Sequence, residues 1–186
     1  VHFADRSLVM TNFTGSFSDV STIAHELGHA WHNRCLAGLP YSLIDTPMPL
    51  AETASIFNEQ LLAHMVLRDA RPDEQLSLLE GNLMETNQTI VDIYSRYLFE
   101  TEVIDTRADH AMSVDELKDA MLRAQEASYG DGLDPEIRHP YMWACKSHYY
   151  SSGYNFYNFP YAFGELFAKG VFAQYLQKGA AFVPDY

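Results

Sequence analysis

Two histidines and a glutamate in the first third of the chain have a spacing suited to metal-dependent hydrolysis. They are His25, Glu26 and His29, in the pattern His-Glu-x-x-His. In a helix, residues four apart lie on one face, so both imidazoles can reach one cation at ~2.0–2.1 Å. Glu26 is one step round the helix from His25 and can reach a metal-bound water without ligating the metal. The pattern therefore predicts a zinc site at which Glu26 acts as general base while water attacks a carbonyl.

A catalytic zinc needs a third protein ligand and an open fourth position, and three residues compete for the role. His32 follows His29 by three residues, but three ligands from one straight helix give poor tetrahedral geometry. Cys35 occupies the place of a third histidine in one longer motif, yet that motif requires glycine where this chain has His32. Glu52 opens a second predicted helix after a proline-rich loop and can offer its carboxylate as that helix crosses the first. We therefore predict His25, His29 and Glu52 as the metal ligands.

Glu59 lies two turns beyond Glu52 on the same predicted helical face. Histidines that bind a metal usually donate their second ring N–H to an acceptor. Glu59 can be that acceptor for His25 or His29, although an exposed surface charge explains a glutamate at this position equally well.

The segment 148–161 combines a histidine with five tyrosines. Buried phenol hydroxyls need hydrogen-bonding partners, so tyrosine is a demanding residue with which to fill a core. Hydrolysis of a peptide bond needs donors aimed at the developing oxyanion, and tyrosine or histidine can supply them beside a metal. Each tyrosine taken singly is better explained as structural, but we expect at least one of the set to reach the substrate.

The elements that position these residues are predicted to be helices. Caps, prolines and apolar spacing place them at about 19–36, 51–68, 72–80, 83–111, 117–129 and 161–177. Ser113 and Glu116 form a capping box before the fifth helix. A strand is expected over Ser7–Phe13. The predicted fold class is mainly α with at most a short N-terminal strand, and residues 1–186 are expected to form a single domain.

Charge and cysteine content limit the partners and the location. The chain of 186 residues has a formal net charge of −13, which repels phosphate backbones and anionic lipids, so we expect neither nucleic acid nor membrane as a partner. No stretch approaches the ~20 apolar residues of a membrane span. Cys35 and Cys145 lack the spacing of a metal or disulfide framework and are expected to be buried thiols in a reducing compartment. This predicts a cytoplasmic location.

Six short motifs occur in order along nearly the whole chain. They are FTGSFSDVST (13–22), HELGHA (25–30), AETAS (51–55), YGDGLD (129–134), HPYMW (139–143) and FYNFPYAFG (156–164). Together they resemble the oligoendopeptidase F branch of the thimet oligopeptidase family of zinc metallopeptidases. The order of six motifs is far more specific than the histidine pattern alone.

The resemblance implies a zincin-type, largely helical metallopeptidase catalytic domain that binds one Zn²⁺ per chain and hydrolyses short peptides. By motif match it assigns zinc to His25, His29 and Glu52, and catalysis to Glu26. It also implies substrate or oxyanion contacts from four residues of the aromatic segment: His148, Tyr154, Tyr157 and Tyr161. His148 and Tyr161 match the family pattern best, because the stretch 151–155 carries extra residues relative to it.

Members of that family are several times longer than their metal-binding core and have a large N-terminal helical part that forms the other wall of the cleft. We therefore expect residues 1–186 to be a fragment of a longer peptidase, with apolar surface that allows self-association. A second hypothesis is a zinc-stabilised domain that binds peptides, or is purely structural, without catalysis. That domain would close the fourth metal position with a protein atom, and the sequence offers no clear fourth ligand.

Overall fold

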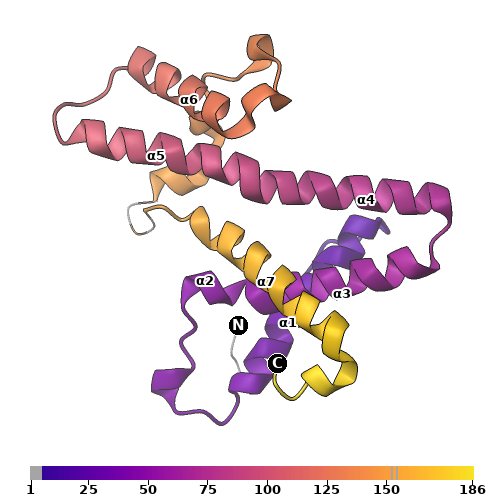
Figure 1. The fold of residues 1–186 in the computed structure, drawn as a ribbon. Helices are drawn as coiled ribbons and strands as arrows, with labels where there is room; N and C mark the ends of the chain where they lie inside the picture. Colours follow the sequence, from indigo (N-terminus) through magenta and orange to yellow (C-terminus); the bar gives the residue numbers. More distant parts are fainter. Residues whose placement is uncertain (1–5, 152, 154) are drawn as a thin grey trace. The chain divides into compact units, whose positions relative to one another are not determined.

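The computed structural model describes residues 6–151, 153 and 155–186, and its regular structure is helical (Figure 1). The α-helices are α1 (Phe17–Leu36), α2 (Met48–Ala51), α3 (Thr53–Asp69), α4 (Pro72–Asn87), α5 (Ile93–Arg107), α6 (Val114–Tyr129) and α7 (Phe159–Lys178). The mainly α prediction is confirmed. The chain packs as two compact units, residues 1–81 with 163–186 and residues 82–162.

The strand predicted over Ser7–Phe13 is wrong. This stretch has no regular structure, the neighbouring Arg6 is an isolated bridge residue, and the described residues contain no second strand that could pair with Ser7–Phe13. The side chains of Leu8, Met10 and Phe13 are exposed. An alternating apolar pattern becomes a strand only where a partner edge satisfies its backbone groups.

In the first unit, α1 begins two residues earlier than expected because its cap is Ser16. Ser16 Oγ accepts the Asp19 N–H at 3.1 Å, and Asp19 Oδ2 accepts the Ser16 N–H at 2.9 Å. The same carboxylate accepts the N–H and the hydroxyl of Thr14, both at 2.8 Å. These hydrogen bonds hold the pKa of Asp19 well below its usual value. The capping box fixes where the histidine-bearing helix starts.

Helices α1 and α3 cross at Gly28, which is buried. A Cβ atom at Gly28 would lie 2.4 Å from the carbonyl oxygen of Ala54 and 2.5 Å from the Cα atom of Ser55. Only glycine permits backbones to approach so closely. Asn58 Nδ2 adds a hydrogen bond of 3.3 Å to the Ala24 carbonyl oxygen across the same crossing.

The apolar core of the first unit lies between α3 and α7. Ile56, Phe57 and Ala168 are buried there, and three partly buried side chains pack against them: Val171, Phe172 and Tyr175. Phe57 meets Phe172 edge to face, with ring centroids 5.8 Å apart.

In the second unit, α5 and α6 lie side by side (Figure 1). The predicted capping box is confirmed: Ser113 Oγ accepts the Glu116 N–H at 3.3 Å, and Glu116 Oε2 accepts the Ser113 N–H at 2.7 Å. The buried residues of this core are Phe99, Ala120, Met121 and Ala124. Helix α6 ends at Gly130, whose φ of 58° lies in the left-handed region that glycine adopts readily.

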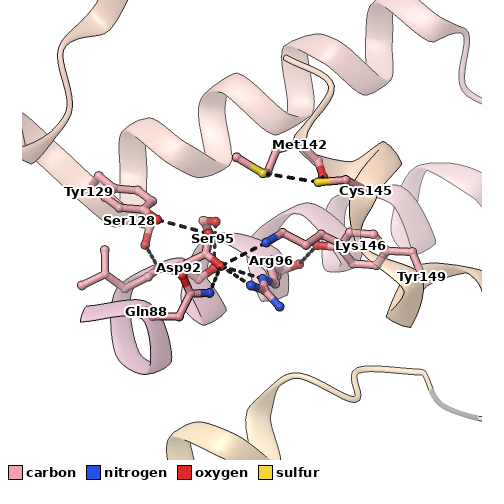
Figure 2. Close-up of polar contacts among 11 residues, drawn as sticks. Gln88, Asp92, Ser95, Arg96, Ser128, Tyr129, Met142, Cys145, Lys146 and Tyr149 are labelled. Atoms are coloured by element: carbon pink, nitrogen blue, oxygen red, sulfur yellow. Dashed lines mark hydrogen bonds and ion pairs between the residues drawn. The ribbon is translucent and has the colours of Figure 1, made fainter. Parts of the chain in front are cut away.

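A π-helical turn, Gln88–Asp92, links α4 to α5. The predicted break between residues 80 and 83 is absent, because α4 continues through Gly81, and the irregularity falls several residues later. Asp92, the last residue of the π turn, is buried, and its Oδ2 atom accepts hydrogen bonds from Arg96 Nε at 2.8 Å and Gln88 Nε2 at 2.7 Å (Figure 2). Tyr129 donates to Asp92 Oδ1 at 3.1 Å.

The burial predicted for the two cysteines is wrong, since both Cys35 and Cys145 are exposed. Cys35 is on the last turn of α1, and Cys145 ends a short 3₁₀ turn. Both are at the ends of elements, where a small apolar side chain has little core to enter.

Candidate metal centre

His25, His29 and Glu52 form the one group of three or more histidine, cysteine or carboxylate side chains in the described part of the chain that could hold a metal ion. One ligand atom from each side chain lies within 4.8 Å of the ligand atoms of the other two. His25 and His29 come from successive turns of α1, and their rings meet edge to face at 4.9 Å. Glu52 is the residue that joins α2 to α3.

The distances in this group fit a single zinc ion. Ligand atoms at about 2.0–2.1 Å from a tetrahedral zinc lie roughly 3.3 Å from one another. Glu52 Oε2 lies 3.2 Å from His25 Nε2 and 3.6 Å from His29 Nε2. The three side chains are 25–31% exposed, so an ion can reach them from solvent. The donor set of two imidazoles and one carboxylate is a usual one for zinc in hydrolases.

Two contacts restrain Glu52. Ser55 Oγ is 2.8 Å from the Glu52 carbonyl oxygen and 3.1 Å from Glu52 Oε2. From the other side, α7 approaches so closely that a Cβ atom at Gly164 would lie 3.0 Å from Glu52 Cβ and 3.3 Å from Ile56 Cδ1. Glu52 is therefore held where α3 begins.

Glu59 orients His25. Its Oε1 atom forms a short hydrogen bond with His25 Nδ1, which leaves Nε2 facing Glu52. Of the two interpretations of Glu59, the structure agrees with the orienting contact, because Glu59 lies against the ring rather than on the surface alone. Burial disfavours the charged imidazolium, but hydrogen bonds to Glu52 and Glu59 outweigh it and raise the pKa of His25 to about 10. The hydrogen bond with His25 in turn lowers the pKa of Glu52.

The two rejected ligand candidates stand apart from this group. His32 and Cys35 line a hollow of about 350 Å³ together with Trp31 and Phe167. Burial, followed by the nearby His29, lowers the pKa of His32. Glu26 is half-buried in α1, one residue beyond His25, as the helical spacing requires.

In the second unit, the structure brings together three of the four predicted aromatic-segment residues. The rings of His148 and Tyr157 stack at 5.4 Å with an interplanar angle of 19°. Tyr161 meets His148 edge to face at 6.1 Å and Tyr157 at 5.9 Å. Tyr154 lies outside the described residues. The Nδ1 atom of His148 is buried and has no hydrogen-bonding partner in the described part of the chain.

Sequence reasoning missed Ser55 and Gly164 as residues that support the site. A serine three residues after a predicted ligand at a helix start is a detectable signal, because its hydroxyl can reach back to that residue. Gly164 gives no such signal, since the close approach of α7 to Glu52 is a tertiary contact between segments more than 100 residues apart.

Comparison with known proteins agrees with these features. The model of Peptidase family M3 matches residues 4–183. The chromosomal oligoendopeptidase F of Lactococcus lactis subsp. cremoris is 29% identical over 164 residues, which are 86% of this chain and 26% of that protein. Oligopeptidase PepF of Bacillus subtilis (strain 168) is 24% identical over 181 residues, which are 96% of this chain and 27% of that protein.

A crystal structure of a "putative peptidase" from Chlamydophila abortus superposes with a TM-score of 0.76 at 27% sequence identity. The match covers 91% of this chain and 28% of the other. The chain thus spans about a quarter of the length of the relatives it matches.

Proposed function

This chain belongs to peptidase family M3, and on that ground we propose that it is the metal-binding part of a zinc endopeptidase that cleaves short oligopeptides. The observation that carries the proposal is the placement of Glu52 Oε2 at 3.2 Å and 3.6 Å from the two histidine Nε2 atoms. The names of its relatives, oligoendopeptidase F and oligopeptidase PepF, support short peptides as the substrate class.

His25, His29 and Glu52 hold the zinc in this proposal. When bound, zinc supplies Lewis-acid chemistry, polarising a carbonyl oxygen and acidifying a coordinated water. Glu26 takes the proton from the attacking water and returns it to the leaving amine. Glu59 keeps the His25 ring turned so that Nε2 faces the site.

His148, Tyr154, Tyr157 and Tyr161 are proposed to contact the substrate or its oxyanion. The Nδ1 atom of His148 supports this role, because it is a buried polar atom that the described residues leave without a partner and that a ligand could pair with. Burial, with the nearby charges of Arg96 and Lys146, lowers the pKa of His148. The imidazole is therefore neutral at neutral pH and can donate through one of its nitrogens.

The alternative, a zinc-stabilised domain without catalysis, needs a fourth protein ligand. The group that the described residues form has three. An open fourth position favours catalysis over a purely structural metal.

The test compares Glu26→Gln with Glu80→Gln, an exposed glutamate on α4. We expect the purified chain to bind one zinc per molecule, and the longer peptidase of which we expect it to be a part to cleave a quenched-fluorescent peptide. Glu26→Gln should keep the zinc and lose hydrolysis, whereas Glu80→Gln should keep both. Undiminished turnover by Glu26→Gln would sink the assignment of the base.

Three expectations stay predictions: a single domain over residues 1–186, self-association, and a cytoplasmic location without nucleic acid or membrane partners. Within the described residues, we find no helix with the length and apolar character that crossing a bilayer demands.

A further inference from the structure

The aromatic pair His148–Tyr157 is held from both flanks by one face of α5. Tyr149, the residue after His148, donates its hydroxyl to the Arg96 carbonyl oxygen at 3.2 Å. Four residues further along the same face, the Glu100 carboxylate accepts the backbone N–H of Phe156 at 2.7 Å and Asn158 Nδ2 at 3.4 Å. The neighbours of Tyr157 on both sides are therefore bound to a single carboxylate.

Phe156 shows why this carboxylate is needed. Its φ of 56° is left-handed, and it is the one non-glycine residue with positive φ among the described residues. A bulky residue in this region is strained by about 1–3 kcal/mol and keeps the conformation only where its surroundings impose it. The Phe156 ring packs on Tyr97 at 5.7 Å, and the N–H is taken by Glu100.

Glu100 and Asn158 are themselves fixed by burial. Glu100 is 9% exposed and Asn158 is 1% exposed. A buried carboxyl group that accepts two hydrogen bonds is costly to disturb, because removing it leaves the Phe156 N–H unsatisfied in the interior. Neither residue is among the catalytic residues predicted from the family resemblance, and the proposed mechanism does not use Glu100.

We propose that Glu100 is a positioning residue: its carboxylate holds residues 156–158 in the conformation that stacks Tyr157 on His148. The inference rests on the proposed function only for the role of the stacked His148–Tyr157 pair, which is contact with the peptide substrate. The stacking itself is a property of the second unit.

Glutamine provides the conservative variant. Its amide oxygen can accept the Phe156 N–H, and its amide nitrogen can donate to Asn158 once that side chain turns over. Asn158 Oδ1 is buried and has no partner in the described structure, so the turned amide gains an acceptor role that is now unfilled. Alanine and the nearly isosteric methionine remove both contacts.

The experiment records ¹³Cε1-histidine NMR spectra of the 186-residue chain, with the His148 signal assigned by its loss in His148→Gln. In Glu100→Ala and Glu100→Met we expect that signal to lose the ring-current shift from Tyr157 and to move towards the position of exposed histidines. Glu100→Gln should restore the wild-type position. Asp105→Ala, an exposed site on the same helix, is the matched control and should leave the signal in place.

Peptide cleavage is the second readout. Glu100→Ala should lower kcat by up to about 100-fold with KM and zinc content little changed, as expected when a transition-state contact is displaced by about 1 Å. Glu100→Gln should recover most of the rate. A purely structural role would instead lower thermal stability without separating kcat from KM.

Two outcomes would overturn the inference. One is a folded Glu100→Ala or Glu100→Met chain whose His148 signal stays where it is in the wild type. The other is a methionine variant that fails to fold, because Glu100 would then support the unit as a whole. A longer peptidase containing this chain that binds zinc but cleaves no peptide would refute the proposed function and leave the NMR result standing, so the two failures can be told apart.

Discussion

Replacing Gly28 by alanine should damage both the fold of the first unit and its metal site. The added Cβ would meet the Ala54 carbonyl oxygen at 2.4 Å and the Ser55 Cα atom at 2.5 Å. Both are backbone atoms, which cannot rotate out of the way as a flexible side chain could. Helices α1 and α3 must therefore separate by about 1 Å to restore ordinary contact.

The size of the effect follows from two opposing contributions. Alanine is favoured over glycine in a helix by about 1 kcal/mol. Overpacking a tight interior contact costs about 1–3 kcal/mol and occasionally more, and a clash with backbone at Gly28 belongs at the upper end. We expect a net loss of about 2 kcal/mol in the free energy of unfolding, or about 4–8 °C in Tm for a chain of this size.

The control is Gly81→Ala in α4, where a Cβ would meet nothing within 4 Å. That variant should gain up to about 1 kcal/mol, so urea unfolding of the two variants should differ by about 3 kcal/mol.

Zinc affinity provides the second measurement on Gly28→Ala. Metal–ligand distances in proteins normally fall within about 0.2 Å of their standard values. The separation moves His25 and His29 on α1 away from Glu52 on α3, so affinity measured by chelator competition should fall at least tenfold. A Gly28→Ala chain as stable as Gly81→Ala, with wild-type zinc affinity, would refute the close crossing as the basis of the site.

Three further predictions concern the surroundings of the ligands. Gly164→Ala should weaken zinc binding severalfold in calorimetry, because the added Cβ would lie 3.0 Å from Glu52 Cβ. The control is Gly170→Ala on the same helix, whose added Cβ meets nothing within 4 Å and which should bind zinc as the wild type does. Equal zinc affinities of the two variants would contradict the role of the close approach at Gly164. Glu59→Gln should lower zinc affinity by about 10–100-fold through loss of the carboxylate that orients His25, and an unchanged affinity would show that the contact is incidental. Because Glu52 and Glu59 raise the pKa of His25 to about 10 in the metal-free chain, zinc binding at neutral pH should displace a proton from His25. Calorimetry in buffers of different ionisation enthalpy should detect this proton release, and zinc affinity should fall as the pH is lowered. Zinc binding without proton release would refute His25 as a ligand.

Local signals made much of the fold, and the grouping of the three candidate ligands, predictable. The capping box of Ser113 and Glu116 predicted a helix start close to that of α6, which begins at Val114 rather than at about residue 117, because both hydrogen bonds form within four residues. The spacing of His25 and His29 placed both rings on one helical face. Glu52 followed from the need for a ligand outside that helix, and its placement beside the histidine pair agrees with the prediction.

What the sequence could not reveal depends on distant contacts. Nothing local distinguishes Gly28, which lies against α3, from Gly81, whose surroundings are empty. The expected break at Gly81 failed for the same reason: glycine weakens a helix by only about 1 kcal/mol, and tertiary context decides whether the helix continues. The contact of Glu100 with Phe156 joins positions 56 residues apart, and no periodic pattern links them.

The first turn of α3 explains why two glycines matter to a site that contains neither. Gly28 brings α1 against Ala54 and Ser55, and Gly164 brings α7 against Glu52. Ordering a free glutamate side chain costs up to about 2 kcal/mol of rotamer freedom. Because packing from both sides and the Ser55 hydroxyl already restrict the Glu52 side chain, much of that entropy is lost on folding rather than on metal binding. We therefore expect the zinc affinity of the proposed centre to depend in part on the backbone spacing of three helices, and not on its three proposed ligands alone.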